Sequence, residues 1–131
     1  MKPDFLILPQ REPEAPWVLP QAALDFLGVV AEASWASLKP EAMAGNHYHK
    51  WRDELLVYQV PQRIWLYWGQ PVKGSEVTIR EIKGPVWVAF MVPAGWAQAV
   101  KNGPDPLVQT LLASRPLVPD APDYHPYFLV S

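Results

Sequence analysis

Proline interrupts this chain so often that long helices are hard to accommodate. Sixteen of its 131 residues are proline, more than twice the usual share. Proline lacks a backbone donor and fixes φ, so it divides a chain into short segments. Here the prolines stand between apolar runs and form no repeat. This arrangement predicts many short strands joined by turns, within one domain that spans residues 1–131.

The apolar runs between the prolines predict seven strands. They cover 4–8, 54–60, 63–68, 76–82, 86–92, 96–102 and 107–113. The stretch 22–39 admits either a helix through Leu24, Phe26 and Leu27 or two strands, and we favour strands at 27–32 and 34–39. The aromatic, proline-rich tail from Arg115 is expected to be ordered and to lie over the body of the domain.

Several of these strands are apolar on both faces, so something must cover the second face. In the strand expected at 63–68, isoleucine, leucine and tryptophan alternate with a second tryptophan and a tyrosine. An antiparallel sheet with one wet face would alternate more regularly between apolar and polar residues. A second sheet layer, the tail or a second subunit would each provide the cover. Because monomers rarely expose large apolar surfaces, we expect a homodimer.

Charge and composition argue against several classes of function. The formal net charge is -2 and no basic cluster occurs, so nucleic acid and anionic membranes are poor partners. No apolar run is long enough to cross a bilayer, and the first residues do not resemble a signal peptide. Cysteine is absent, which excludes a disulfide scaffold. We therefore expect a cytoplasmic protein whose partner is a small molecule.

The run 44–54 carries most of the polar chemistry. It holds His47, His49 and Glu54 in the pattern His-x-His-x4-Glu. Alternate residues of an extended chain share a face, so both histidines can point to one side while Tyr48 points to the other. If Glu54 points inward with Tyr58, its carboxylate needs a partner or a metal. The pattern predicts a divalent-metal site or an acid–base cluster; the alternative is an exposed turn before an ordinary strand.

A second polar segment follows a tight turn at Pro93 and Gly95 and contains Gln98 and Asn102. Together the two segments resemble the motifs of the cupin superfamily, His-x-His with a Glu and a later Gly, and Pro-x-Gly-x-x-His-x3-Asn. The resemblance covers about residues 45–102. It implies an all-β fold, the RmlC-like double-stranded β-helix or jelly-roll barrel. The barrel core would span about 27–113, with the N-terminal strand and the proline-rich tail packed on it.

The cupin resemblance also implies a ligand set for a metal. His47, His49 and Glu54 match three ligand positions, and Gln98 stands where the family usually has a histidine. An amide oxygen binds more weakly than imidazole, so a four-ligand centre, a three-ligand centre and no metal at all are all open. The ion would be divalent Zn, Mn, Fe or Ni. Without a metal, Gln98 would instead hydrogen-bond to Glu54 or to a histidine.

The run 45–50, Gly-Asn-His-Tyr-His-Lys, is similar to that of sugar-modifying cupins, namely nucleotide-sugar ketoisomerases and the cupin domain of capsular-polysaccharide enzymes. This similarity implies isomerisation or epimerisation of a keto-sugar nucleotide, with His47 or His49 as the catalytic base. Trp96 and Tyr58 would contact the ligand, although core packing is the alternative for Trp96. A non-catalytic cupin that binds a metal or a metabolite, and a non-haem metal oxygenase, are also open.

The cations of the chain do not indicate a phosphate site. A nucleotide diphosphate is best held by two or more convergent cations. Lys50 and Arg52 are expected to form a solvated rim near the histidines. The other candidates are scattered along the sequence: Arg63, Lys73, Arg80 and Lys83. This lack of a clamp favours the non-catalytic alternative.

Overall fold

The computed structural model describes residues 1–8, 18–119 and 122–130. The elements of this part of the chain are β1(Asp4–Leu8), α1(Gln21–Leu27), β2(Glu32–Leu38), β3(Met43–Tyr48), β4(Glu54–Val60), β5(Arg63–Gly69), β6(Val77–Lys83), β7(Val86–Val92), β8(Ala97–Asn102), β9(Leu107–Ala113) and β10(His125–Pro126). All seven predicted strands are present within a residue of their expected bounds. β3 and β10 were not delimited from the sequence.

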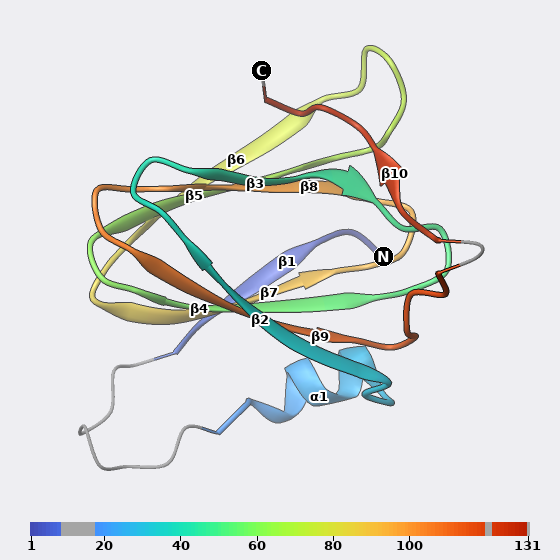
Figure 1. Cartoon of the computed structure of the whole chain (residues 1–131), viewed down its shortest axis with the longest axis horizontal. Coiled ribbons are helices and arrows are strands. Elements are labelled where there is room, and N and C mark those ends of the chain that lie inside the picture. Colours follow the sequence, from blue (N-terminus) through green and yellow to red (C-terminus); the bar gives the residue numbers. More distant parts are fainter. Residues whose placement is uncertain (9–17, 120–121, 131) are drawn as a thin grey trace.

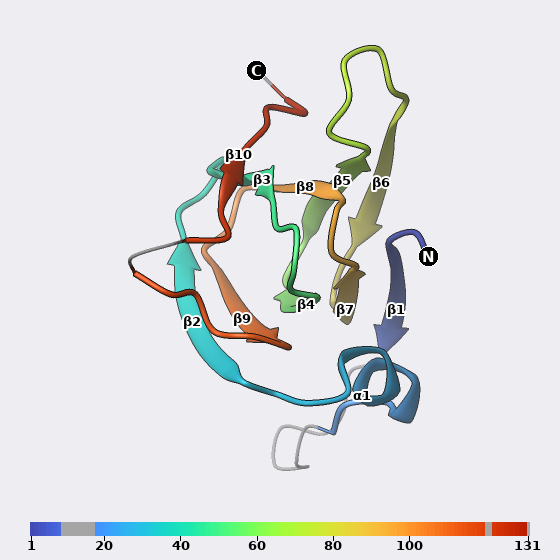
Figure 2. The same ribbon diagram turned by 90° about the vertical axis from the view of Figure 1, so that its right-hand side faces the viewer.

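Two antiparallel five-stranded sheets face each other (Figure 1). One has the order β1-β7-β4-β9-β2, and the other has the order β10-β3-β8-β5-β6. Figure 2 shows the same two layers from the side, with β1 and β6 at one edge of the pair. The predicted all-β class and the jelly-roll arrangement are confirmed.

The main core fills the space between the two sheets. Its buried members come from both layers and include Leu56, Tyr58, Ile64, Leu66, Phe90 and Val100. A second cluster lies on the outer face of β4 and β7, beneath α1. The helix therefore covers the second apolar face of these two strands from within the same chain.

The strand predicted at 27–32 is wrong, because α1 and a single strand, β2, replace the two strands favoured for 22–39. Ala23 and Leu27 of α1 are buried against Leu55 and Met91 of the sheet. Gly28, with a φ of 70°, ends the helix and donates its N–H to the carbonyl of Leu24. A helix this short owes its stability to packing on an apolar sheet face, which a local pattern does not reveal.

The tail is ordered over its described residues, and part of it lies beside the histidine run. β10 pairs with β3, with His125 opposite Tyr48. The side-chain oxygen of Asn46 accepts the backbone N–H groups of Leu129 and Val130 at 3.0 and 3.3 Å. Asn46 thereby fastens the tail to the sheet through backbone groups.

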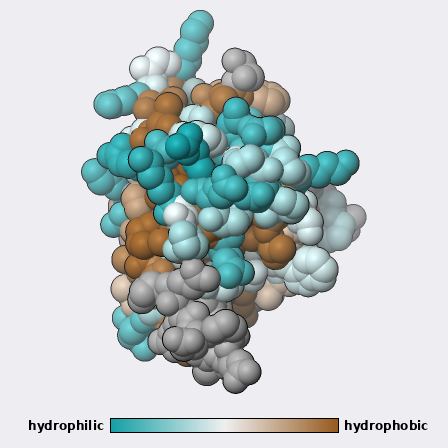
Figure 3. Space-filling view, turned by 90° about the vertical axis from the view of Figure 1, so that its left-hand side faces the viewer, coloured by the Kyte–Doolittle hydropathy of each residue, from teal (hydrophilic) through white to brown (hydrophobic). Residues whose placement is uncertain are grey.

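The surface gives two further facts. Hydrophilic and hydrophobic side chains are interspersed on the face that Figure 3 shows. No helix within the described residues is long and apolar enough to cross a membrane.

Leu27→Ala is expected to lower the free energy of unfolding by about 2–4 kcal/mol, because it opens a cavity beneath α1. Leu24→Ala is the matched control: Leu24 lies in the same helix but is 38% exposed, and its loss should cost less than about 1 kcal/mol. Urea denaturation measures both values. Equal losses would show that the contact of α1 with the sheet contributes nothing special to stability.

Candidate functional site

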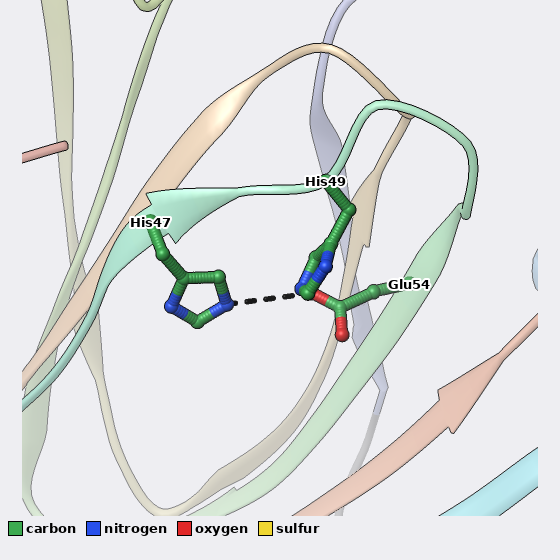
Figure 4. A group of neighbouring side chains, drawn as sticks. All are labelled: His47, His49 and Glu54. Atoms are coloured by element: carbon green, nitrogen blue, oxygen red, sulfur yellow. Dashed lines mark ion pairs between the residues drawn. The ribbon is translucent and has the colours of Figure 1, made fainter. Parts of the chain in front are cut away.

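His47, His49 and Glu54 converge between the two sheets (Figure 4). His47 lies near the end of β3, His49 directly after it, and Glu54 begins β4 of the other sheet. Glu54 Oε1 is 3.9 Å from His47 Nε2 and 3.2 Å from His49 Nε2. One ligand atom from each residue can be chosen so that all lie within 4.8 Å of one another. The structure thus brings the three predicted residues together in a buried cluster.

Gln98 lies next to this cluster on β8, paired in register with His47. Gly45, which has a φ of 94°, allows the close approach, because a Cβ there would lie 2.9 Å from Gln98 Oε1 and 2.7 Å from the Gln98 carbonyl oxygen. Within the described residues Gln98 Oε1 is buried without a hydrogen-bond partner. In the described part of the chain, the amide oxygen of Gln98 therefore accepts no hydrogen bond from a histidine.

The cluster contains acceptors that face one another without donors. His49 Nδ1 hydrogen-bonds to the backbone carbonyl of Asp123, which assigns its proton to Nδ1 and leaves Nε2 as an acceptor in the neutral ring. Among the described residues, His49 Nε2, Glu54 Oε1 and Gln98 Oε1 are all buried and unsatisfied. Such atoms are costly unless a proton or a cation lies between them. Two imidazoles, a carboxylate and an amide oxygen fit a divalent Zn, Mn, Fe or Ni ion.

Arg52 holds the carboxylate of Glu54 in place. Its Nη2 and Nε donate to Glu54 Oε2 at 2.6 and 3.2 Å, and its Nη1 donates to Glu32 Oε2 at 2.9 Å. Because Arg52 occupies Oε2, Oε1 faces the histidines. Outer partners of this kind orient the ligands of metal sites. The prediction of a solvated rim is wrong for Arg52, which is 4% exposed, because Glu32 and the carbonyl of Arg115 lie against it.

The protonation states of Glu54 and His47 favour the binding of a cation. Burial alone would raise the pKa of Glu54, but the interactions with His49 and Arg52 outweigh burial and hold the pKa below its usual value. Burial lowers the pKa of His47, although the charge of Glu54 opposes this shift. At neutral pH the cluster therefore offers a carboxylate and a neutral His47 imidazole, the forms that bind metals.

The tail contributes two residues that the sequence did not predict. The Tyr124 ring stacks on His47, with centroids 4.5 Å apart, and meets His49 edge-on at 6.0 Å. The carboxylate of Asp123 accepts the backbone N–H groups of Lys50 and Trp51, each at 2.7 Å. The sequence signals were the aromatic character of the tail and its run of Asp, Pro and Tyr, which do not say where the tail returns to the body.

The two predicted ligand-contacting residues lie in different surroundings. Tyr58 is in the core, where its hydroxyl donates to Gln109 Oε1 at 2.6 Å. Burial, reinforced by the charge of Glu54, raises its pKa well above the usual value. Trp96 is half-buried, and the N–H of its neighbour Gly95 donates to the carbonyl of His49 at 2.6 Å. Tyr58 thus contributes to packing, Trp96 lies at the rim of the site, and ligand contact by either stays a prediction.

No family model and no curated protein sequence matches this chain. Solved structures do match. The capsular polysaccharide assembling protein CapF from Staphylococcus aureus is 20% identical at a TM-score of 0.67, over 76% of this chain and 27% of CapF. A double mutant of ChmJ, a 3'-monoepimerase from Streptomyces bikiniensis, in complex with dTDP, is 17% identical at a TM-score of 0.68, over 93% of this chain and 65% of ChmJ.

A third similar structure is QdtA, a sugar 3,4-ketoisomerase from Thermoanaerobacterium thermosaccharolyticum, in complex with TDP. It is 18% identical at a TM-score of 0.56, over 72% of this chain and 65% of QdtA. This chain therefore spans about a quarter of CapF and just under two thirds of the other two. These likenesses show the fold: the chain has the jelly-roll arrangement, the double-stranded β-helix, of these structures.

Arg52→Met is expected to lower the free energy of unfolding of the metal-free protein by about 3–5 kcal/mol, because it leaves the buried Glu54 carboxylate without its partner. Arg63→Met is the control, since Arg63 pairs with Glu81 on the surface, where its side chain is 50% exposed. That loss should stay below about 1 kcal/mol. Urea denaturation compares the two variants, and similar losses would contradict a special role for Arg52.

Proposed function

We propose that this protein is a metal-binding cupin that acts on a carbohydrate-type ligand, most concretely by isomerising or epimerising a keto-sugar nucleotide. The observation that carries the proposal is the convergence of His47, His49 and Glu54 on one point inside the barrel. The similar structures support the substrate class. ChmJ is a 3'-monoepimerase, and QdtA has been crystallised, as a mutant, with TDP-4-keto-6-deoxyglucose.

The chemistry follows from the acidity of a carbon next to a carbonyl group. A neutral imidazole, whose ordinary pKa lies near neutral pH, accepts the proton from that carbon and leaves an enolate. Return of the proton to the other face inverts the carbon; return to the neighbouring carbon, with transfer of a hydroxyl proton, moves the carbonyl. Alternatively, a divalent ion held by His47, His49, Glu54 and Gln98 would supply Lewis acidity toward the carbonyl oxygen, and the two histidines would then be its ligands rather than the base.

The residues of the chain divide this work. In the metal-free cluster, His49 is the base that we favour, because the Asp123 carbonyl holds its proton on Nδ1 and leaves Nε2 basic. The Glu54 carboxylate, 3.2 Å from Nε2, stabilises the positive charge that the ring gains. Arg52 keeps that carboxylate ionised. His47 is the alternative base, since burial keeps its ring neutral.

A second candidate is a cupin that binds a metal or a metabolite without turnover. Gln98 in place of an imidazole favours it, because an amide oxygen is the weaker ligand. A non-haem oxygenase would use the same two histidines and carboxylate. Two further expectations also stay predictions: a cytoplasmic location, and a homodimer, with which the 75% exposure of Trp35 on the edge strand β2 is consistent.

Elemental analysis of the purified protein, after reconstitution, is expected to find about one divalent metal per chain. His47→Ala should lose most of it, since one ligand is removed, and Gln98→Ala should lose less. The control is His125→Ala, because His125 stacks on Tyr48 and pairs with the Asp123 carboxylate but provides no atom to the cluster. Full metal content in His47→Ala would show that the cluster does not bind the ion.

In deuterated water, the protein is expected to exchange a proton next to the carbonyl of TDP-4-keto-6-deoxyglucose. His49→Asn should slow this exchange about 100-fold or more, because it removes the base. His125→Asn is the control and should exchange at the wild-type rate. Proton NMR follows the signal, and an unchanged rate in His49→Asn would overturn the assignment of the base.

A further inference from the structure

A cavity of about 450 Å³ lies near the turn that joins β5 to β6, in the sheet that also carries His47. Two cations, Lys2 and Arg80, line it together with two indoles, Trp68 and Trp96. The volume lies within the range of sites for small ligands. The fold therefore brings together two cations that are scattered in the sequence.

One row of sheet positions connects this cavity to the cluster. The row runs across β3, β8, β5 and β6, from His47 through Gln98 and Trp68 to Thr78. Residues directly opposite each other in antiparallel strands point to the same face. Three strand spacings of about 4.8 Å separate the ends of the row. Thr78 also lines the cavity, so the cavity lies on the same face of this sheet as His47, about three strand spacings away.

Both cations are available to a ligand. Within the described residues, no carboxylate forms an ion pair with Lys2 or Arg80, whereas Arg52 and Arg63 are paired. Arg80 lies 5.7 Å from the centre of the Trp68 ring, and only its Nη1 donates in the described part of the chain, to the carbonyl of Ile79. A guanidinium has five N–H donors, so most of them are free for an anion.

The N-terminal segment is held against the rim of the cavity. Trp96 Nε1 donates to the carbonyl of Met1 at 2.9 Å. This bond keeps the adjoining Lys2 close to the cavity. Trp96 is also next to Gly95, whose N–H binds the carbonyl of His49. The rim of the cavity and the imidazole cluster are therefore fixed relative to each other.

We propose that this cavity binds the nucleoside diphosphate part of the ligand. Convergent cations suit the paired charges of a diphosphate, and an indole face suits a flat base. Lys2 and Arg80 contact the diphosphate, and Trp96 lies against the base. This inference rests on the proposed function, in which the sugar lies at the imidazoles, and it defines the ligand as a sugar carried on a nucleoside diphosphate.

Glu76 tests whether the charge of the cavity lining controls the binding of the diphosphate. Its carboxylate lines the same cavity as the two cations. A negative charge at this place opposes the binding of a diphosphate. Removing that charge should therefore strengthen binding, while removing either cation should weaken it.

Calorimetric titration with dTDP tests the subsite. Lys2→Ala and Arg80→Ala should each weaken binding roughly tenfold or more, as expected for hydrogen bonds to a charged group. Glu76→Gln should tighten binding about two- to fivefold. Lys83→Ala is the matched control and should bind normally, since Lys83 is an exposed cation of the same strand, β6, outside the lining of this cavity. Inorganic pyrophosphate should bind more weakly than dTDP, and thymidine more weakly still.

Three outcomes would overturn the inference. One is wild-type affinity for dTDP in both Lys2→Ala and Arg80→Ala, and another is no binding of dTDP at millimolar concentration. A third is equal affinity for dTDP and pyrophosphate, which would show that the base contributes nothing to binding and that the cavity does not recognise a nucleoside.

The His49→Asn variant separates this inference from the proposed function. Because dTDP lacks the keto sugar that would lie at the imidazoles, it should bind this variant with wild-type affinity even though the metal is lost. Loss of dTDP binding in His49→Asn would place the diphosphate on the cluster and overturn the subsite. Normal dTDP binding by a protein that never takes up metal or exchanges a proton would contradict the proposed chemistry and support the subsite.

Discussion

A carboxylate inside an apolar interior is the constraint on which the rest of this site depends. Glu54 begins a strand whose inward neighbours are all apolar, so its charge needs compensation at that place. Arg52 supplies it, and the same guanidinium binds Glu32 of β2 and the carbonyl of Arg115. One buried cation thus connects two strands and the start of the tail. The orientation of Glu54 toward the histidines follows from this arrangement.

The predictions that succeeded depended on residues close together in the sequence. Apolar runs bounded by proline predicted the strands, because the pattern of apolar residues that marks a strand lies within the strand itself. His47, His49 and Glu54 lie within one short run, so strand parity was enough to place the histidines on one side. The failures all involve distant partners. Helix α1 needs the outer face of β4 and β7, Arg52 needs Glu32, and the contacts of Tyr124 need the pairing of β10 with β3.

The two sheets contribute unlike parts of the site. Glu54 comes from the sheet that packs on α1. His47, Gln98 and Trp68 come from the other sheet. The cluster is therefore a contact between layers, and any ion that binds only the folded cluster also stabilises the packing of one sheet on the other. The row of positions that leads from the imidazoles to the cavity lies in a single sheet, so its geometry does not depend on how the layers sit.

The attachment of the tail has a consequence for how the site can diverge between related proteins. Asn46 binds the backbone of Leu129 and Val130, and the pairing of β10 with β3 is likewise a backbone contact. The path of the tail is thus largely independent of its side chains. The residue at position 124, which covers His47, can then change in size or polarity while the cover stays in place. A substitution at position 124 can therefore change the wall beside the two histidines without changing the barrel.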